Sequence, residues 1–352
     1  MLLRIVLFLA MSLTAVAAGF PQASEHDFTI RNYQFKNGES LPELRIHYRT
    51  LGTIHRSADG KVDNAVLIMH GTTGSGAQFM RESFAGELFG PGQPLDAAKF
   101  FIVLPDGIGH GGSSKPSNGL RARFPKYTYD DMVSAVHRLL TEGLKVDHLR
   151  LVMGTSMGGM HTWVFAERYP NFVDAVMPFA SLPVQIAGRN RMWRKIAMDA
   201  ITTDPAWKNG EYTQQPRGLA IASGMLALMS SNPVIRQREL PTRDQADKFL
   251  DTQAAEYLKT ADANDVLYAL NASRDYDPST QLGKIVAPLL AVNSADDLIN
   301  PPELGILERE IKKVKRGTAI VIPLSDETVG HGSHTKATLW KQYLVRLLEE
   351  SD

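Results

Sequence analysis

The chain has 352 residues, of which 43% are hydrophobic and 22% charged, and this ordinary globular composition excludes a disordered or collagen-like protein. Lysine and arginine total 38, as do aspartate and glutamate, so the formal net charge is zero and nucleic acid is not an expected partner. The absence of cysteine excludes disulfides, thiolate metal sites and a cysteine nucleophile, and leaves Ser, His, Asp, Glu, Lys and Arg for any chemistry.

The first residues have the order of a secretory signal peptide. Residues 1–18 carry one early cation, Arg4, then the apolar run Ile5–Leu13, then small residues that allow cleavage after Ala17 or Ala18. The alternatives are a buried strand or an uncleaved anchor. Because a spanning helix needs about 20 apolar residues and polar ones follow too soon, we expect export to the periplasm or the medium, without stable membrane insertion.

Short apolar runs and helical patterns then alternate along the chain. An antiparallel opening is indicated by Phe28–Ile30 and Leu44–Tyr48, on either side of the turn Lys36–Gly38. The later predicted strands are Val66–Met69, Phe100–Leu104, Leu149–Met153, Ala175–Phe179, Leu289–Val292 and Thr318–Ile322, and the predicted helices are Tyr129–Leu140, Gly158–Arg168 and Lys336–Glu349. Strands that are apolar on both faces predict an α/β fold whose mostly parallel sheet has helices on both faces, built from residues 25–181 and 283–352.

The segment from Leu182 to Leu282 breaks this alternation, because it contains helical patterns and no predicted strand. Its predicted helices are Arg191–Ile201, Gly218–Met229 and Arg243–Thr260, and the run Leu219–Met229 is expected to be a buried helix. An insertion between two strands of an open sheet lies over the carboxyl ends of the strands, where such sheets bind ligands. We therefore expect a helical lid over residues 182–282, with some of its apolar side chains lining an acyl pocket: Trp193, Met198, Leu226, Met229 and Tyr257.

The sharpest chemical signal is Gly154-Thr155-Ser156-Met157-Gly158-Gly159, between a predicted strand and a predicted helix. A serine hydroxyl becomes a nucleophile when a tight strand–turn–helix elbow lifts it clear of the sheet, and flanking glycines relieve the crowding of that turn. The alternative is an ordinary glycine-rich turn. With the strand before it and the helix after it, the pattern favours Ser156 as the nucleophile.

A second loop predicts the groups that would stabilise a developing oxyanion. The strand Val66–Met69 ends in His70-Gly71-Thr72-Thr73-Gly74, where this architecture places one backbone N–H of an oxyanion hole. We expect Thr72 to supply it, together with the N–H of Met157 at the start of a helix. His70 is expected to be structural, and the glycine-rich Asp106–Ser113 to be a tight loop rather than a phosphate site.

A serine nucleophile needs a base, and the base needs an orienting carboxylate. Candidate acids, Asp296 and Asp297, follow one late strand, and candidate bases, His331 and His334, follow the next. Asp297 is preferred because it stands four residues before Pro301, and His331 because Gly330 precedes it; both choices rest on the usual pattern of such loops. The alternatives are a solvated turn for the aspartates, and a plain loop pair or two metal ligands without visible partners for the histidines. No metal or cofactor is expected.

These residues resemble the α/β-hydrolase superfamily and, more narrowly, its homoserine O-acetyltransferase-like branch. The likeness covers about Phe28 to Leu348 and rests on Ser156–Met160, Tyr48–Gly52, Phe124–Pro125, Asp130–Val133, Asn264–Tyr268, Asp275 and Asp277. It implies an α/β-hydrolase fold, an acyl-transfer triad of Ser156, Asp297 and His331, and a homodimer through the lid helices. It also implies an arginine that binds a substrate carboxylate, for which Arg121 and Arg123 are candidates.

Two departures change the expected function. Gly112–Pro116 runs almost directly into Phe124, so the substrate-shaping region is short and homoserine specificity is not expected. Export would also separate the protein from acetyl-CoA, a cytoplasmic donor. We therefore expect an exported serine esterase that acts on a small acyl substrate through an acyl-enzyme. The alternatives are an acyltransferase with an acyl-CoA donor and a non-catalytic binding protein, which would need a broken triad.

Overall fold

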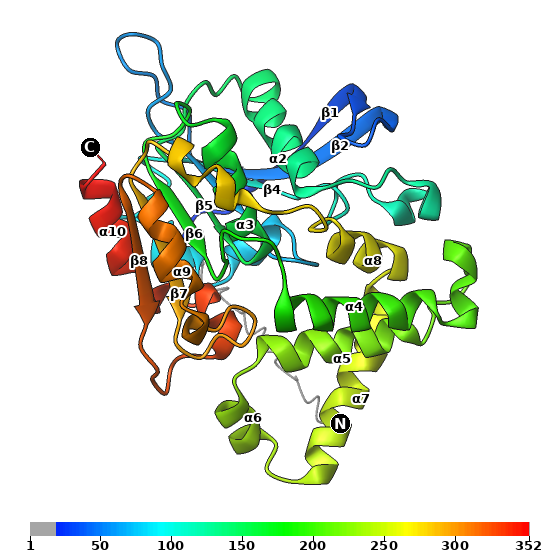
Figure 1. Ribbon diagram of the computed structural model, residues 1–352. Helices are drawn as coiled ribbons and strands as arrows, with labels where there is room; N and C mark the ends of the chain where they lie inside the picture. Colours follow the sequence, from blue (N-terminus) through cyan, green and yellow to red (C-terminus); the bar gives the residue numbers. More distant parts are fainter. Residues whose placement is uncertain (1–18, 352) are drawn as a thin grey trace, which may run out of the picture.

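One eight-stranded sheet runs through residues 19–351, the part of the chain that this computed structural model describes (Figure 1). The predicted signal peptide, residues 1–18, lies outside the described residues. The strand order is β1-β2-β4-β3-β5-β6-β7-β8. The strands are β1 Ser24–Gln34, β2 Ser40–Leu51, β3 Ala65–Met69, β4 Phe101–Pro105, β5 Leu151–Thr155, β6 Val176–Phe179, β7 Leu289–Ser294 and β8 Gly317–Ile322.

The strand directions agree with the predicted mixed sheet. β1 pairs antiparallel with β2, and β2 pairs antiparallel with β4, whereas every pairing from β4 through β8 is parallel. The carboxyl ends of the parallel strands therefore meet at one edge, which is where loops of such sheets form binding sites. The α/β prediction and its antiparallel opening are confirmed.

Each face of the sheet buries its own apolar cluster. Along β3, Leu67 packs on the side of Trp163, while Val66 and Ile68 pack on the side of Trp340. This alternation reflects the two-residue period of a strand, and both tryptophans are fully buried. Helices α2 Tyr129–Arg138, α3 Met157–Arg168 and α9 Ile306–Glu310 cover the first face, and α1 Ala85–Leu88 and α10 Lys341–Glu349 cover the second.

The predicted helices differ from the observed ones mainly at their ends. Thr128 caps α2 as a capping box with Asp131: its backbone N–H donates to the aspartate at 2.8 Å, and its hydroxyl faces the Asp131 N–H. Such a box fixes where a helix begins. The last predicted helix starts five residues late, at Lys341, because the chain before it is used in short 3₁₀ turns around residues 330–339.

Five helices lie between β6 and β7 and form the lid, seen in green to yellow in Figure 1. They are α4 Gly188–Thr202, α5 Gly218–Ser230, α6 Pro233–Glu239, α7 Arg243–Thr260 and α8 Ala263–Asn271. The lid has its own core, in which Trp193, Leu219 and Leu270 pack together. The prediction that Leu219–Met229 is a buried helix is wrong for one face, since Ile221 and Leu228 are 55% and 63% exposed.

Within residues 19–351, no single helix is long and apolar enough to cross a membrane. Taken together, α5 and α6 have the length and apolar composition of a membrane span, but the chain bends by 110° between them.

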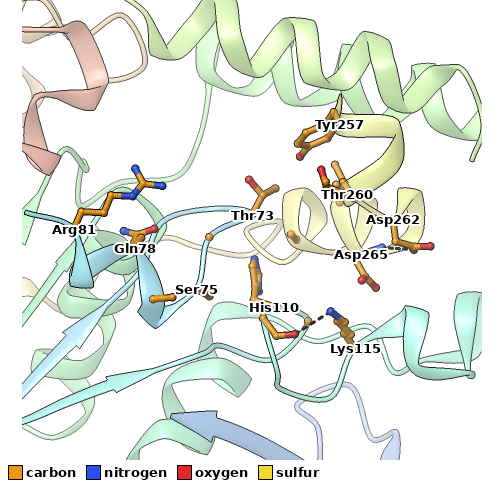
Figure 2. A pocket seen from close by; sticks show the side chains of 17 residues that line it. Thr73, Ser75, Gln78, Arg81, His110, Lys115, Tyr257, Thr260, Asp262 and Asp265 are labelled. Atoms are coloured by element: carbon orange, nitrogen blue, oxygen red, sulfur yellow. Dashed lines mark hydrogen bonds between the residues drawn. The ribbon is translucent and has the colours of Figure 1, made fainter. Parts of the chain in front are cut away.

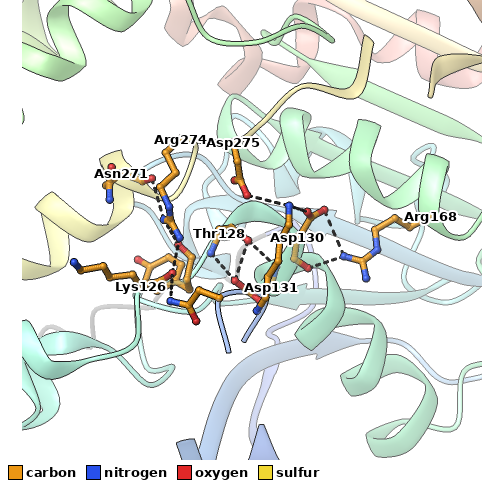
Figure 3. Close-up of polar contacts among 11 residues, drawn as sticks. Lys126, Thr128, Asp130, Asp131, Arg168, Asn271, Arg274 and Asp275 are labelled. Carbon is orange, nitrogen blue, oxygen red and sulfur yellow. Dashed lines mark hydrogen bonds and ion pairs between the residues drawn. The ribbon is translucent and has the colours of Figure 1, made fainter. Parts of the chain in front are cut away.

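Polar contacts fasten the end of the lid to the core, as Figure 3 shows. After α8, the guanidinium of Arg274 donates to the carbonyls of Tyr127 and Lys126 at 2.8 and 2.6 Å. Next along the chain, Asp275 pairs with Lys36 at 2.9 Å, and Lys36 also pairs with Asp130 of α2 at 2.5 Å. The lid therefore returns to the sheet along a fixed path beside the β1–β2 hairpin.

Candidate active site

Ser156 lies at a strained turn between β5 and α3. Its backbone has φ 57° and ψ −113°, a conformation that non-glycine residues rarely adopt. The neighbouring chain is close on both sides: a Cβ added at Gly154 would lie 2.2 Å from the carbonyl oxygen of Gly158, and one at Gly158 would lie 1.9 Å from that of Met69. The two glycines therefore permit the turn, and strain at such a residue is typical of functional sites.

Three predicted residues meet in a continuous chain of hydrogen bonds. His331 Nε2 lies 2.8 Å from Ser156 Oγ, and its Nδ1 lies 2.9 Å from Asp297 Oδ2. With the Nδ1 proton donated to the carboxylate, Nε2 is free to accept the serine proton. The residues come from three loops at the carboxyl ends of β5, β7 and β8.

The Asp297 carboxylate is fixed by its own loop. Its Oδ1 accepts the backbone N–H groups of Ile299 and Asn300 at 2.8 and 3.1 Å. Burial raises the pKa of Asp297, but the facing His331 and these N–H donors outweigh it, so the pKa lies below its ordinary value. The side chain is therefore an ionised acceptor at neutral pH, suited to orienting an imidazole.

Asp296, the alternative acid, has different partners. Its carboxylate accepts from the Asn232 side chain at 2.6 Å, from the Gly330 N–H at 2.7 Å and from the Ser294 hydroxyl at 2.8 Å. These contacts join the lid to the loops of Asp297 and His331. The structure thus brings Asp297, rather than Asp296, against the imidazole.

His334, the alternative base, lies beside His331 rather than beside Ser156. The two rings pack edge to face with centroids 5.4 Å apart, and His334 Nδ1 is buried without a hydrogen-bond partner among the described residues. Burial lowers the pKa of His334 to about 3. It is therefore a neutral ring that supports the face of its neighbour.

The predicted oxyanion donors, Thr72 and Met157, lie near the nucleophile. Thr72 lines the same cavity as Ser156, and Met157 is the first residue of α3, directly after the serine. His70, before Thr72, is held within the core: its Nδ1 contacts the Gly71 carbonyl at 2.8 Å, and its Nε2 accepts the Gly107 N–H at 2.9 Å. This histidine ties the two glycine-rich loops together, in keeping with the structural role predicted for it.

Ser156 opens into a cavity of about 360 Å³, here called the catalytic cavity, which also contacts His331 and Thr72. Lid side chains form its far wall, among them Trp193, Leu226 and Tyr257, as the sequence predicts. The prediction that Met198 and Met229 line the pocket is wrong: both pack inside the lid core and neither lines this cavity. A helix buries most of its apolar stripe against neighbours, so few apolar residues reach a pocket.

The catalytic cavity has a cationic wall residue that sequence reasoning missed. Arg194 is only 2% exposed, and its guanidinium donates to Asn190 at 3.1 Å and to Ser273 at 3.4 Å. No pattern in the lid marks it, because its burial depends on how α4 packs against the segment after α8. The expected candidates lie elsewhere: Arg121 pairs with Glu211 at 3.1 Å, and neither Arg121 nor Arg123 lines the catalytic cavity.

A second, polar cavity of about 500 Å³ adjoins the first, and both are lined by Thr73, Gln78 and Tyr257 (Figure 2). Its floor is the β4 loop with Lys115, and its roof is the lid, where Tyr257 points down from α7. Charged side chains line it as well, among them Arg81, Lys115 and Asp265.

Among residues 19–351, no group of three or more His, Cys, Asp or Glu side chains is arranged to hold a metal ion.

The chain matches the family described as alpha/beta hydrolase fold over residues 64–325. A probable acyltransferase of Methanothermobacter thermautotrophicus is 30% identical to it over 80% of this chain and 85% of the relative. A homoserine O-acetyltransferase of Pelobacter propionicus is 29% identical over 87% of this chain and 91% of the relative. The predicted resemblance to the homoserine O-acetyltransferase-like branch is confirmed.

Solved structures extend the likeness to esterases. An acetylester hydrolase from Corynebacterium glutamicum superposes with a TM-score of 0.80 at 21% identity, covering 93% of this chain and 96% of that one. At this identity the likeness concerns the fold. The family match and the curated relatives together identify an enzyme of the alpha/beta hydrolase fold that is similar to acyltransferases.

Proposed function

The chain belongs to the alpha/beta hydrolase fold family, and on this premise we propose that it is a serine hydrolase that cleaves a carboxylic ester. The observation that carries the proposal is the unbroken contact from Asp297 through His331 to the Ser156 hydroxyl, at 2.9 and 2.8 Å. A non-catalytic relative would have no reason to keep a strained serine in contact with an oriented imidazole.

In the first half of the reaction, Ser156 Oγ attacks the ester carbonyl while its proton moves to His331 Nε2. The backbone N–H groups of Thr72 and Met157 receive the oxyanion, and the dipole of α3 adds to their effect. Collapse of the tetrahedral intermediate breaks the bond to the alcohol. His331 returns the proton to the departing alkoxide, and an acyl ester on Ser156 remains.

In the second half, water enters and His331 removes one of its protons. The hydroxide attacks the acyl carbonyl, a second tetrahedral intermediate forms, and the proton on Nε2 returns to Ser156 Oγ as the carboxylic acid leaves. Throughout, ionised Asp297 holds the imidazole in the tautomer whose Nε2 can accept, and stabilises the imidazolium.

The polar cavity that adjoins the catalytic cavity supports a second candidate function. An alcohol that enters there in place of water would accept the acyl group, and two curated relatives are named as acyltransferases. The same residues would then transfer an acyl group from an acyl-CoA or another ester. The choice depends on which acceptor reaches the acyl-enzyme faster.

The test is turnover of p-nitrophenyl acetate by the purified protein and by Ser156→Ala, with Ser279→Ala as a matched control outside the cavity. We expect Ser156→Ala to lose at least about 10³-fold in kcat, with Ser279→Ala unchanged. Equal turnover by Ser156→Ala would overturn the proposal. Adding an alcohol separates the two functions, because a transferase gives the new ester, whereas a hydrolase gives acetate.

Export and pairing are further parts of the proposal. Export is supported by the order of residues 1–18, and N-terminal sequencing of the native protein tests it: a start after Ala17 or Ala18 supports it, and a start at Met1 contradicts it. Pairing through the lid is supported by the exposed apolar side chains of Ile221 and Leu228 on α5. Sedimentation of wild type and Leu228→Glu tests it, since a dimer through this face would separate into monomers.

A further inference from the structure

A third cavity shares Ile299 with the catalytic cavity, and its walls are mostly apolar. It measures about 310 Å³ and is lined by Met160, Leu182, Val184, Ile186, Ile299 and Ile306, among others; we call it the apolar cavity. Four polar residues also line it, Gln185, Arg189, Asn190 and Asn300, whereas no acidic side chain of the described residues does. A space of this size with mostly apolar walls suits a hydrocarbon chain.

The apolar cavity lies close to the nucleophile. Met160 lines it from α3, one helical turn after Ser156, and the Met160 N–H donates to the Ser156 carbonyl at 2.9 Å. Ile299 lines both this cavity and the catalytic cavity. The side chain of Ile299 therefore stands where an acyl group that extends from Ser156 would pass from one space to the other.

Ile299 forms a rigid wall at this position. Its side chain is only 8% exposed and packs into the lid core, and its backbone N–H donates to Asp297 at 2.8 Å. A β-branched side chain has few rotamers, so it cannot swing aside easily. Moving the backbone would instead disturb the carboxylate that orients His331.

From this placement we propose that Ile299 sets the acyl-chain length of the substrate. In the native protein it closes the catalytic cavity, so acetyl to butyryl esters are preferred. Removal of its side chain joins the apolar cavity to Ser156 and admits medium chains such as hexanoyl and octanoyl. This inference rests on the proposed ester hydrolysis and adds the class of acyl group to it.

The experiment measures kcat/KM for p-nitrophenyl acetate, butyrate, hexanoate and octanoate. We expect Ile299→Ala to raise the octanoate-to-acetate ratio at least about tenfold, since each buried methylene contributes about fourfold. Ile299→Val, a smaller change that keeps the branched shape, should shift the ratio in the same direction by less. The double variant Ile299→Ala/Val184→Phe, which refills the apolar cavity, should return the ratio toward that of wild type.

Ile201→Ala is the matched control, because Ile201 is buried in the same lid core but lines neither cavity. It should lose stability while its chain-length ratio stays that of wild type. An unchanged ratio in folded Ile299→Ala and Ile299→Val, both still labelled at Ser156 by a fluorophosphonate, overturns this inference alone. A wild type that is neither labelled nor active overturns the proposed function instead.

Discussion

Asn232 of the lid donates a 2.6 Å hydrogen bond to Asp296, the residue directly before Asp297. The same carboxylate oxygen accepts the N–H of Gly330, directly before His331, at 2.7 Å. One carboxylate thus links the lid to both loops that carry the proposed acid and base. The position of the lid and the alignment of the imidazole are mechanically coupled through Asp296.

Loss of the Asn232–Asp296 hydrogen bond should disturb the alignment of His331 while the proposed catalytic residues stay in place. We predict that Asn232→Ala lowers kcat/KM by about tenfold, because the Asp296 carboxylate loses a charge-assisted hydrogen bond and the loops gain freedom. Steady-state kinetics on a p-nitrophenyl ester measures the effect. Asn271→Ala, on α8 and outside the catalytic cavity, is the control and should keep wild-type kinetics.

Substitution of the two adjacent aspartates, Asp296 and Asp297, should lower kcat to very different extents. Asp297→Asn is predicted to lower kcat by on the order of 10⁴-fold, the size found when a triad carboxylate is made neutral and the imidazole takes the wrong tautomer. Asp296→Asn keeps the hydrogen-bonding shape and should lose no more than about tenfold. The opposite ranking of the two variants would mean that Asp296 is the acid.

His331 and His334, whose rings pack together, allow the same comparison for the proposed base. His334→Phe should keep kcat within about tenfold of wild type, because a neutral, partly buried ring is exchanged for another ring of similar size. His331→Phe removes the proposed base and should lose at least about 10³-fold. Labelling by a fluorophosphonate provides an independent readout: it should survive in the first variant and fail in the second.

Glu167, on α3, predicts a pH-dependent stability unrelated to catalysis. Burial raises its pKa to about 8, and its Oε1 has no hydrogen-bond partner within the described residues. Because the folded pKa lies above the unfolded value of 4.5, the stability it contributes is complete below pH 4.5 and is lost as the pH rises through 8. The Tm of wild type should therefore fall relative to that of Glu167→Gln between pH 6 and pH 9. Parallel Tm curves would contradict this prediction.

Gly158 should tolerate no side chain. Gly158→Ala places a Cβ 1.9 Å from the carbonyl oxygen of Met69, so α3 or β3 must shift. We predict a loss of about 3 kcal/mol in the free energy of unfolding, at the upper end of overpacking costs. Chemical denaturation measures it, with Gly224→Ala as the control, since no atom lies within 4 Å of a Cβ there.

The parts of the fold with strong local patterns could be predicted from the sequence. β3 and β5 are buried on both faces, and α7 has a capping box at Thr242, so their residues carry clear periodicity or end signals. α6 could not be predicted in the same way, because Pro233–Glu239 is short and no residue in it is buried. The position of α6 depends on Asn232. The side chain of this residue accepts the first N–H groups of α6 and donates to Asp296.

In the candidate site too, local sequence patterns predicted some residues, whereas others are placed only by tertiary packing. Ser156 and the loops of Asp297 and His331 follow strands, and their glycines and prolines mark the turns. Arg194 and Ile299 reach the catalytic cavity only through packing between the lid and the core, which no local pattern encodes. The same packing explains why Met198 points into the lid rather than into the cavity.

The order of the proposed triad along the chain has a consequence for biosynthesis. Ser156 belongs to the first half of the polypeptide, whereas His331 follows β8, the last strand of the sheet. Because a ribosome delivers the N-terminal part first, a nascent chain can already present the strained serine while its base is still untranslated. We therefore predict that the enzyme gains activity only when synthesis is nearly complete, and that a premature stop before residue 331 yields an inactive product.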